Sequence, residues 1–351
     1  MTDHPALRAI LEAAWQGGAA PGLAASVRRD GAPLLHAAAG FADWERAQPL
    51  DADAPMYAYS VTKTLLAALA LQFVEAGRIT LETPVRAILA EAADLPIFTV
   101  RQLLNHTAGL PDYGALPAYA AALREHPGRA WDAGEFLART LGAAPPIEPG
   151  ARWAYSNIGY LLVRLMIERL AGAPLAAVVA ERLAAPLGLR HTRLAADLAD
   201  AAGLAPGFSA QLDPAGRVAD IAASYDPGWV AHGTVRTTAD ELCLLLAALG
   251  DGTLLAPASW AAMREPVPVP VTHPRFRQPA YGLGLMIDAA PGGAVGHGGG
   301  GPGYGAGAIQ LTAGDGASIT SAVLANHDAD EAALLLAFDL AQAAANLPAA
   351  R

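Results

Sequence analysis

Lys63 is the only lysine in a chain of 351 residues that otherwise carries arginine, and Ser60 stands three residues before it. Residues at positions i and i+3 share one face of a helix. A helix that begins near Ser60 would therefore place a hydroxyl nucleophile beside an amine that can act as its base. Arginine could not replace that amine, because a guanidinium stays protonated in proteins. A lone SxxK spacing is also typical of an ordinary surface lysine, but the scarcity of lysine favours a chemical role.

A lysine acts as a base only if its pKa falls. At the ordinary pKa of about 10.4, fewer than about 1 in 1000 side chains is neutral at pH 7. Burial among apolar neighbours and a nearby positive charge would lower the pKa of Lys63. The run that follows, 65–74, is apolar except for Gln72 and could supply such neighbours.

A second motif is the triplet Tyr155-Ser156-Asn157 in a chain with only four asparagines. Tyr155 could share a proton with Lys63, and Asn157 could hold Lys63 and the substrate carbonyl. A YxN triplet by itself is common, and it usually places an aromatic ring in the core and an asparagine in a turn.

A third motif is the glycine-rich run GHGGGGPGYGAG at 296–307. Its GYGAGA has the form of a dinucleotide loop, which requires a helix next. Strand and turn residues follow instead, so the pattern excludes that site. We interpret the run as a strand edge where glycines let a substrate approach the backbone. Its amides, within His297, Gly298, Gly299 and Gly300, could donate to an oxyanion.

In this order the three motifs resemble the serine β-lactamase and penicillin-recognising hydrolase superfamily. The resemblance is to its class C β-lactamase-like branch, which includes esterases, D-aminopeptidases and DD-peptidases. The stretches LLNHTAGLPDY (103–113) and HGTVRTTADEL (232–242) fit that branch too. The chain contains no GxSxG, which argues against an α/β-hydrolase.

The resemblance implies a serine hydrolase that transfers an acyl group to water through an acyl-Ser60 intermediate. Lys63 would be the base partner and Tyr155 the proton relay toward the leaving group. Asn157 would orient Lys63 and the substrate, and the amides of Ser60 and Gly300 would form the oxyanion hole. No cofactor or metal is implied. Lys63 and Tyr155 are expected to titrate as a coupled pair, so either could be the base.

The third motif departs from the KTG of true β-lactamases, because His297 replaces the cation that pairs with a substrate carboxylate. A histidine is charged only below about pH 6.5. This lowers the expectation for β-lactam hydrolysis and raises it for esters or small amides. His297 could equally be a structural hydrogen-bonding residue.

Other candidates are weaker. Tyr113 and Tyr304 could wall the acyl pocket or be ordinary loop aromatics. We expect His106 and His232 to hydrogen-bond the loops that line the cleft.

The pattern of elements predicts an α+β fold. Residues 22–29 and 33–41 read as a hairpin, and strands 281–288, 305–312 and 317–326 precede a last helix at 330–346. We expect an antiparallel sheet built from both termini and flanked by helices, in a domain of residues 1–80 plus 266–351. Residues 81–265 would form a mostly helical inserted domain, with the active site in the cleft between the two.

The composition limits the classes of partner that we expect this protein to bind. The net charge is −10 and no basic block is present, which argues against nucleic acid or an anionic membrane. Cys243 is the only cysteine, and no HxxxH pair supports a zinc site. No secretory signal or apolar run of about 20 residues is seen, which predicts a cytoplasmic protein. The expected partner is a small ester, amide or peptide.

Three functions remain open at this point. The first is an esterase-like serine hydrolase. The second is a D-amino-acid peptidase or amidase, or a weak β-lactamase, where the peptidase needs an anchor for the substrate's ammonium or carboxylate. The third, of another class, is a non-catalytic relative that uses the cleft for binding.

Overall fold

The computed structural model describes residues 3–43, 45, 47–328 and 330–348. The ends of the predicted first domain, residues 1–2 and 349–351, lie outside the described residues. The predicted hairpin is present: β1 (Gly22–Arg29) and β2 (Ala32–Gly40) pair in antiparallel register. Asp30 and Gly31 turn the chain between them with φ angles of 47° and 79°.

The central sheet is antiparallel and joins both ends of the chain. Its order is β2-β1-β13-β12-β11-β10-β9-β8. The six strands from the C-terminal part are β8 (Val267–Pro268), β9 (Pro279–Tyr281), β10 (Met286–Asp288), β11 (Val295–Gly301), β12 (Tyr304–Thr312) and β13 (Ser318–Ala325). The N-terminal hairpin meets them where β1 pairs with β13, with Leu23 opposite Ala325. The predicted α+β fold with a sheet from both termini is therefore confirmed.

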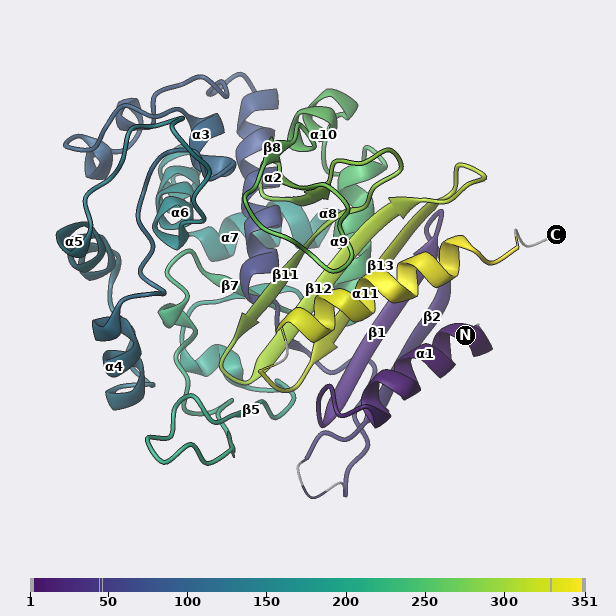
Figure 1. The fold of residues 1–351 in the computed structure, drawn as a ribbon. Helices are drawn as coiled ribbons and strands as arrows, with labels where there is room; N and C mark the ends of the chain where they lie inside the picture. The colour runs from purple at the N-terminus through teal and green to yellow at the C-terminus, as the bar shows by residue number, and fades with distance from the viewer. Residues whose placement is uncertain (1–2, 44, 46, 329, 349–351) are drawn as a thin grey trace.

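Helices cover both faces of this sheet (Figure 1). On one face lie α1 (Pro5–Gln16) and α11 (Asp330–Ala345), and on the other lies α9 (Ala239–Gly250). Alternate residues of β1 divide between the two cores, because successive strand side chains point to opposite faces. Leu23 packs in the core beneath α1 and α11, whereas Ala24 packs in the larger core on the other face.

The larger core continues into a region of helices and short strands. Its other helices are α3 (Val100–Leu104), α4 (Pro117–Glu125), α5 (Ala133–Ala143), α6 (Asn157–Ala171), α7 (Leu175–Val179), α8 (Ala185–Leu187) and α10 (Pro257–Met263). Single turns are η1 (Tyr59–Val61), η2 (Val85–Ala87), η3 (Ala90–Ala92), η4 (Ala180–Ala184), η5 (Leu198–Ala201) and η6 (Pro227–Trp229). Short strands are β3 (Met56–Tyr57), β4 (Arg193–Ala195), β5 (Phe208–Ser209), β6 (Ala219–Asp220) and β7 (Thr234–Thr237).

Local signals account for several boundaries in this region. Thr99 and Gln102 form a capping box at the start of α3. Gly172 closes α6 with a φ of 67°. The helix α9 lies within the predicted helical insert, yet it packs on the sheet against β1, β12 and β13. The division at residues 80 and 265 stays a prediction.

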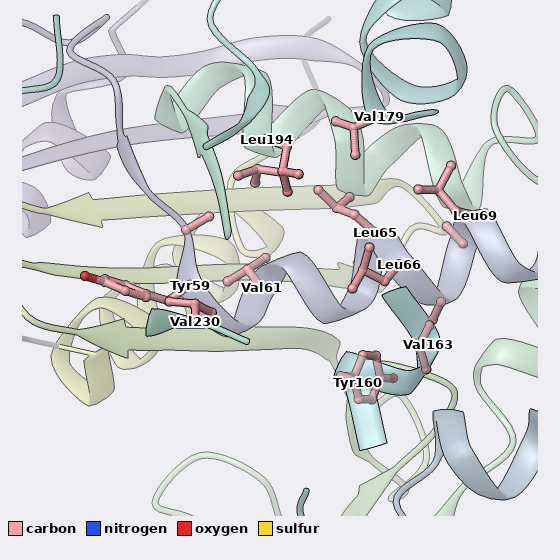
Figure 2. Close-up of a cluster of buried hydrophobic side chains, with 14 of the residues drawn as sticks. Tyr59, Val61, Leu65, Leu66, Leu69, Tyr160, Val163, Val179, Leu194 and Val230 are labelled. Atoms are coloured by element: carbon pink, nitrogen blue, oxygen red, sulfur yellow. The ribbon is translucent and has the colours of Figure 1, made fainter. Parts of the chain in front are cut away.

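The helix α2 (Thr62–Glu75) runs through the middle of the molecule. Every residue from Thr62 to Leu71 is buried, so the helix has no solvent face over these turns. A helix that is apolar all round belongs in a core. Figure 2 shows its leucines, such as Leu66, gathered with Tyr160 and Val163 of α6. Lys63 is the only residue of an ionisable type between Thr62 and Leu71.

Candidate active site

Ser60 lies in η1, where the chain turns from β3 into α2. Its neighbour Tyr59 has a φ of 45°, in the left-handed region that bulky residues rarely adopt. The Tyr59 amide donates to Thr234 Oγ1 at 2.9 Å, and its hydroxyl donates to the Pro302 carbonyl. Contacts from two distant segments therefore hold a bend that places Ser60 at the entry to α2. Strained backbone of this kind gathers at functional sites.

Lys63 meets Ser60 as the spacing predicts. Its Nζ donates to Ser60 Oγ at 2.9 Å. The lysine side chain is 0% exposed. Burial lowers the pKa of Lys63 well below its ordinary value, and the carboxylate of Asp112 opposes that shift. A buried amine with a lowered pKa can be neutral near pH 7 and accept a proton.

Tyr155 completes a cluster with these two residues. Its ring centroid lies 4.9 Å from Lys63 Nζ, and its hydroxyl is hydrogen-bonded to Ser60. Burial raises the pKa of Tyr155 above its ordinary value, although the hydrogen bond with Ser60 opposes the shift. The phenol therefore stays protonated at neutral pH. His106 fixes this segment, because its Nδ1 accepts from the Ser156 amide at 3.1 Å and its ring lies 4.4 Å from that of Tyr155.

Asn157 is the first residue of α6, and its hydrogen bonds go to Asp112 rather than to Lys63. Its amide N–H donates to Asp112 Oδ1 at 2.7 Å, and its Nδ2 donates to Asp112 Oδ2 at 3.3 Å. Within the described part of the chain, no hydrogen bond joins Asn157 to Lys63. The predicted role of Asn157 in holding Lys63 stays a prediction, and in this structure Asn157 positions a carboxylate at the edge of the site.

The strand β11 passes beside η1, and its glycines allow the close approach. A Cβ at Gly299 would lie 2.2 Å from the Ala58 carbonyl and 2.9 Å from the Ser60 amide. Gly298 faces the other side of the sheet, toward Leu334 of α11. The pairing of β11 with β10 ends at Gly296, and the strand also contacts η1. The role of the Gly300 amide as the second donor of an oxyanion hole stays a prediction.

His297 lies on the same face of β11 as Gly299, with a side chain that is 1% exposed. Its Nε2 is 2.8 Å from the Tyr281 hydroxyl, and its Nδ1 is 2.5 Å from the Gly298 carbonyl. Burial first, and the charge of Lys63 second, lower the pKa of His297 to about 3. The ring therefore stays neutral far below the pH of about 6.5 expected from the sequence. A structural, hydrogen-bonding His297 agrees with these contacts.

The two aromatic pocket candidates make hydrogen bonds to backbone groups outside this cluster. The Tyr113 hydroxyl accepts from the Ala231 amide at 3.1 Å, and its ring packs 4.6 Å from Phe136. The Tyr304 hydroxyl donates to the Ala205 carbonyl at 2.7 Å. Both side chains are buried. Their role as pocket walls stays a prediction.

An apolar cavity of about 90 Å³ opens beside Tyr155. Trp153 and Tyr155 form one wall, and residues of β9, β10 and the segment that precedes them form the other. That segment carries Val271, which is one of the few exposed large apolar side chains among the described residues. The cavity suits a short alkyl group or one side of a ring.

Two residues near Lys63 make contacts that the sequence did not predict. The sequence predicts that His232 hydrogen-bonds a loop that lines the cleft. In the structure its Nε2 lies 3.2 Å from Lys63 Nζ. Asp112 received no role, although it is the carboxylate that acts on both Lys63 and Tyr155. Both lie in stretches that carry the family resemblance, but nothing in their local sequence indicates which residue they meet.

Two features that the described residues lack concern possible partners. No three His, Cys, Asp or Glu side chains come close enough together there to hold a metal ion. In the same part of the chain, no helix has the length and apolarity needed to cross a membrane.

The fold and the site together define a mixed α/β protein in which a buried lysine meets a partly exposed serine and tyrosine beside an antiparallel sheet. Comparison with known proteins gives the family. The model of the Beta-lactamase family matches residues 7–345, and the chain belongs to this family. The resemblance drawn from the three motifs is therefore confirmed.

Among individual relatives, esterase EstB of Burkholderia gladioli is 33% identical over 198 residues, which cover 52% of this chain and 50% of EstB. A D-aminopeptidase of Brucella anthropi is 32% identical over 200 residues, which cover 56% of this chain and 37% of that protein. The matched part thus spans half or less of these relatives. Their names agree with the leading predicted function and its first alternative.

Solved structures extend the likeness over the whole chain. A D-stereospecific amidohydrolase from Streptomyces sp. has a TM-score of 0.79 and 28% identity, and the match covers 99% of this chain and 100% of that chain. A D-amino acid amidase from Ochrobactrum anthropi SV3 has a TM-score of 0.80, with 97% of each chain covered. Its identity of 23% supports the fold alone.

Proposed function

We propose that this chain is a serine hydrolase that cleaves small uncharged esters through an acyl-Ser60 intermediate. The observation that carries the proposal is the hydrogen bond of 2.9 Å between Nζ of the fully buried Lys63 and Oγ of Ser60, which is partly exposed. A nucleophile beside a base with a lowered pKa is the arrangement that acyl transfer requires. Membership in the Beta-lactamase family supports the same chemistry.

In the proposed mechanism Lys63, rather than Tyr155, is the base. The lowered pKa of Lys63 favours a neutral amine, and the raised pKa of Tyr155 keeps its phenol protonated. Lys63 takes the Ser60 proton while Ser60 Oγ bonds to the carbonyl carbon. Tyr155 then gives its phenol proton to the leaving oxygen and recovers a proton from Lys63. Water releases the acyl group by the same steps in reverse order.

The negative charge that develops on the substrate oxygen needs donors. The amides of Ser60 and Gly300 are suited to this role, because β11 lies against η1 at Gly299. Backbone amides on rigid elements need no reorganisation during the reaction, and each such donor contributes about 10²–10³ in rate.

The surroundings favour an uncharged substrate. His297 stays neutral, so it provides no cation for a substrate carboxylate. The cavity beside Tyr155 has an almost wholly apolar lining. Both features favour an ester with apolar groups over a β-lactam that carries a carboxylate.

The first experiment compares p-nitrophenyl butyrate hydrolysis by the wild type, Ser60→Ala and Lys63→Arg. We expect no enzymatic turnover in Ser60→Ala. Lys63→Arg should lose at least about 100-fold in kcat/KM, because a guanidinium cannot accept the Ser60 proton. Equal activity of Ser60→Ala and the wild type would sink the nucleophile assignment. No wild-type activity and no covalent adduct with an acylating probe would support the non-catalytic binding alternative.

A second candidate function is hydrolysis of a D-amino-acid amide or peptide. Asp112 favours it, because its carboxylate lies at the edge of the Lys63–Tyr155 cluster and could pair with a substrate ammonium. A D-aminopeptidase and a D-stereospecific amidohydrolase are among the relatives. Rates with D-Ala and L-Ala p-nitroanilide decide the matter. A preference for D that disappears in Asp112→Asn supports this function, and equal rates remove it.

A further inference from the structure

His232 is the second polar contact of the only lysine in the chain. It lies two residues before β7, is 1% exposed, and places its Nε2 3.2 Å from Lys63 Nζ. The other neighbours of Nζ are the nucleophile Ser60 and the faces of the Tyr155 and Tyr160 rings. Among the described residues, His232 is thus the one side chain besides Ser60 that lies within hydrogen-bond reach of the amine.

The chemistry of Lys63 requires such a partner. When Lys63 takes the Ser60 proton it becomes an ammonium with three N–H donors and no acceptor. A buried ammonium without acceptors is strongly disfavoured. Among the described residues no hydrogen bond joins Asn157 to Lys63, so Asn157 does not fill this role in the structure. The oxygen of Ser60 becomes bonded to the substrate, which leaves the lone pair of His232 Nε2.

His232 also has an unpaired atom that fold stability does not explain. Its Nδ1 is buried and has no hydrogen-bond partner among the described residues. A ring that accepts through Nε2 carries its proton on Nδ1 and leaves a buried donor unsatisfied. Such a group destabilises the fold, and groups of this kind in folded proteins call for a separate explanation such as catalysis.

We propose that His232 is a positioning residue of Lys63, whose Nε2 accepts a hydrogen bond from the ammonium formed when Lys63 takes the proton of Ser60. This inference rests on the proposed function. Ser60, Lys63 and His232 then form a triad, in which Ser60 is the nucleophile, Lys63 is its base and His232 accepts from the protonated base. The histidine keeps the amine aimed at Ser60 and stabilises its charged form.

The ring is suited to accepting because it stays neutral. Burial first, and the charge of Lys63 second, lower the pKa of His232 well below its ordinary value. The remaining titratable or charged side chains that act on Lys63 or His232 are Asp112, Tyr155, Tyr160, His106, Arg164 and His297.

The single lysine allows a direct test. Protein labelled with ¹³C-lysine, with a lysine-free tag, has one lysine signal, so the pKa of Lys63 can be followed by NMR without assignment. The variants are His232→Phe, which keeps a ring but removes the acceptor, and His232→Gln, which restores an acceptor. If His232→Phe does not fold, as judged by thermal unfolding, His232→Leu replaces it.

We expect the pKa of Lys63 to fall by about one unit or more in His232→Phe, because the charged amine loses its acceptor. The value of kcat for p-nitrophenyl butyrate should fall about 10- to 100-fold with little change in KM. The acidic limb of the pH–rate profile should move to lower pH with the pKa. His232→Gln should recover most of both values. An unchanged or raised pKa of Lys63 in His232→Phe would overturn the proposal.

The NMR measurement of the Lys63 pKa distinguishes a failure of this inference from a failure of the proposed function. An inactive wild type whose lysine signal still responds to His232→Phe would overturn the hydrolase and keep the contact between His232 and the Lys63 ammonium. An active wild type whose lysine signal ignores His232→Phe would keep the hydrolase and overturn the role of His232.

Discussion

At the scale of the residue, Lys63 is unfavourable for the stability of the fold but is needed for the proposed function. Its amine lies at 0% exposure among apolar side chains, where a charge is disfavoured. An apolar residue of similar length would suit α2 better. The chain keeps lysine there because the proposed chemistry needs a group that can both lose and gain a proton. Such conflicts between local preference and global fold are expected at functional sites.

Lys63→Met should therefore stabilise the protein while it removes activity. We expect a gain of about 1 kcal/mol or more in the free energy of unfolding near pH 6, since an apolar side chain replaces a buried ionisable one. Urea unfolding of the two proteins measures the gain.

The gain should depend on pH in a defined sense. The unfolded lysine binds its proton up to about pH 10.4. The folded lysine releases it at lower pH, because burial lowers the pKa of Lys63. Between the two values the unfolded state holds more protons, so the wild type grows more stable as pH rises. The advantage of Lys63→Met should shrink toward about pH 10.4. Arg124→Met, which removes an exposed cation, serves as the control and should show no such trend.

At the scale of the element, the site depends on how closely β11 approaches η1. Gly299 has no side chain, and its Cα faces the Ala58 carbonyl and the Ser60 amide. Gly301 likewise faces the ring of Tyr59. These two glycines let a strand and a turn come into backbone contact, so that amides of both can face one substrate oxygen.

Gly299→Ala should separate these elements. A methyl group 2.2 Å from a carbonyl oxygen forces the backbone to move, which widens the gap between the two oxyanion donors. We expect kcat for p-nitrophenyl butyrate to fall about 100-fold or more. Gly314→Ala is the matched control, because a Cβ there meets nothing within 4 Å. Equal kcat values for the two variants would refute the proposed oxyanion geometry.

At the scale of the whole molecule, the two ends of the chain are joined in one sheet. Asn326, at 0% exposure, lies at this junction. Its Oδ1 accepts from the Gly22 amide at 2.7 Å, and its Nδ2 donates to the Phe41 carbonyl at 3.1 Å. One side chain thus connects the end of β13 to both strands of the N-terminal hairpin.

Asn326→Ala should weaken this junction. It leaves the buried Gly22 amide and the part-buried Phe41 carbonyl without this partner, and an unsatisfied buried group costs about 1–3 kcal/mol. We expect the free energy of unfolding to fall by about 2–4 kcal/mol in urea titrations, with KM little changed because the site is distant in sequence and made by other elements. Asn346→Ala, at an exposed position, should lie within about 0.5 kcal/mol of the wild type. A loss as large in Asn346→Ala would remove the special role of Asn326.

Much of the fold could be predicted from the sequence because its signals are local. The hairpin turn at Asp30–Gly31, the capping box at Thr99 and the terminating Gly172 depend on residues within a few positions of each other. The proximity of Ser60 and Lys63 belongs to the same class, since one helical turn sets it.

Tertiary structure alone decided what surrounds Lys63. His232 is 169 residues away from it in the chain, and Asp112 binds Asn157 across 45 residues. Whether an ionisable group is charged depends on the burial and charges that distant segments supply, and no local pattern encodes these. For that reason the sequence by itself determined the family and the proximity of Ser60 and Lys63, while the fold decided the neutral His297, the contact of Asn157 with Asp112 and the contact between Lys63 and His232.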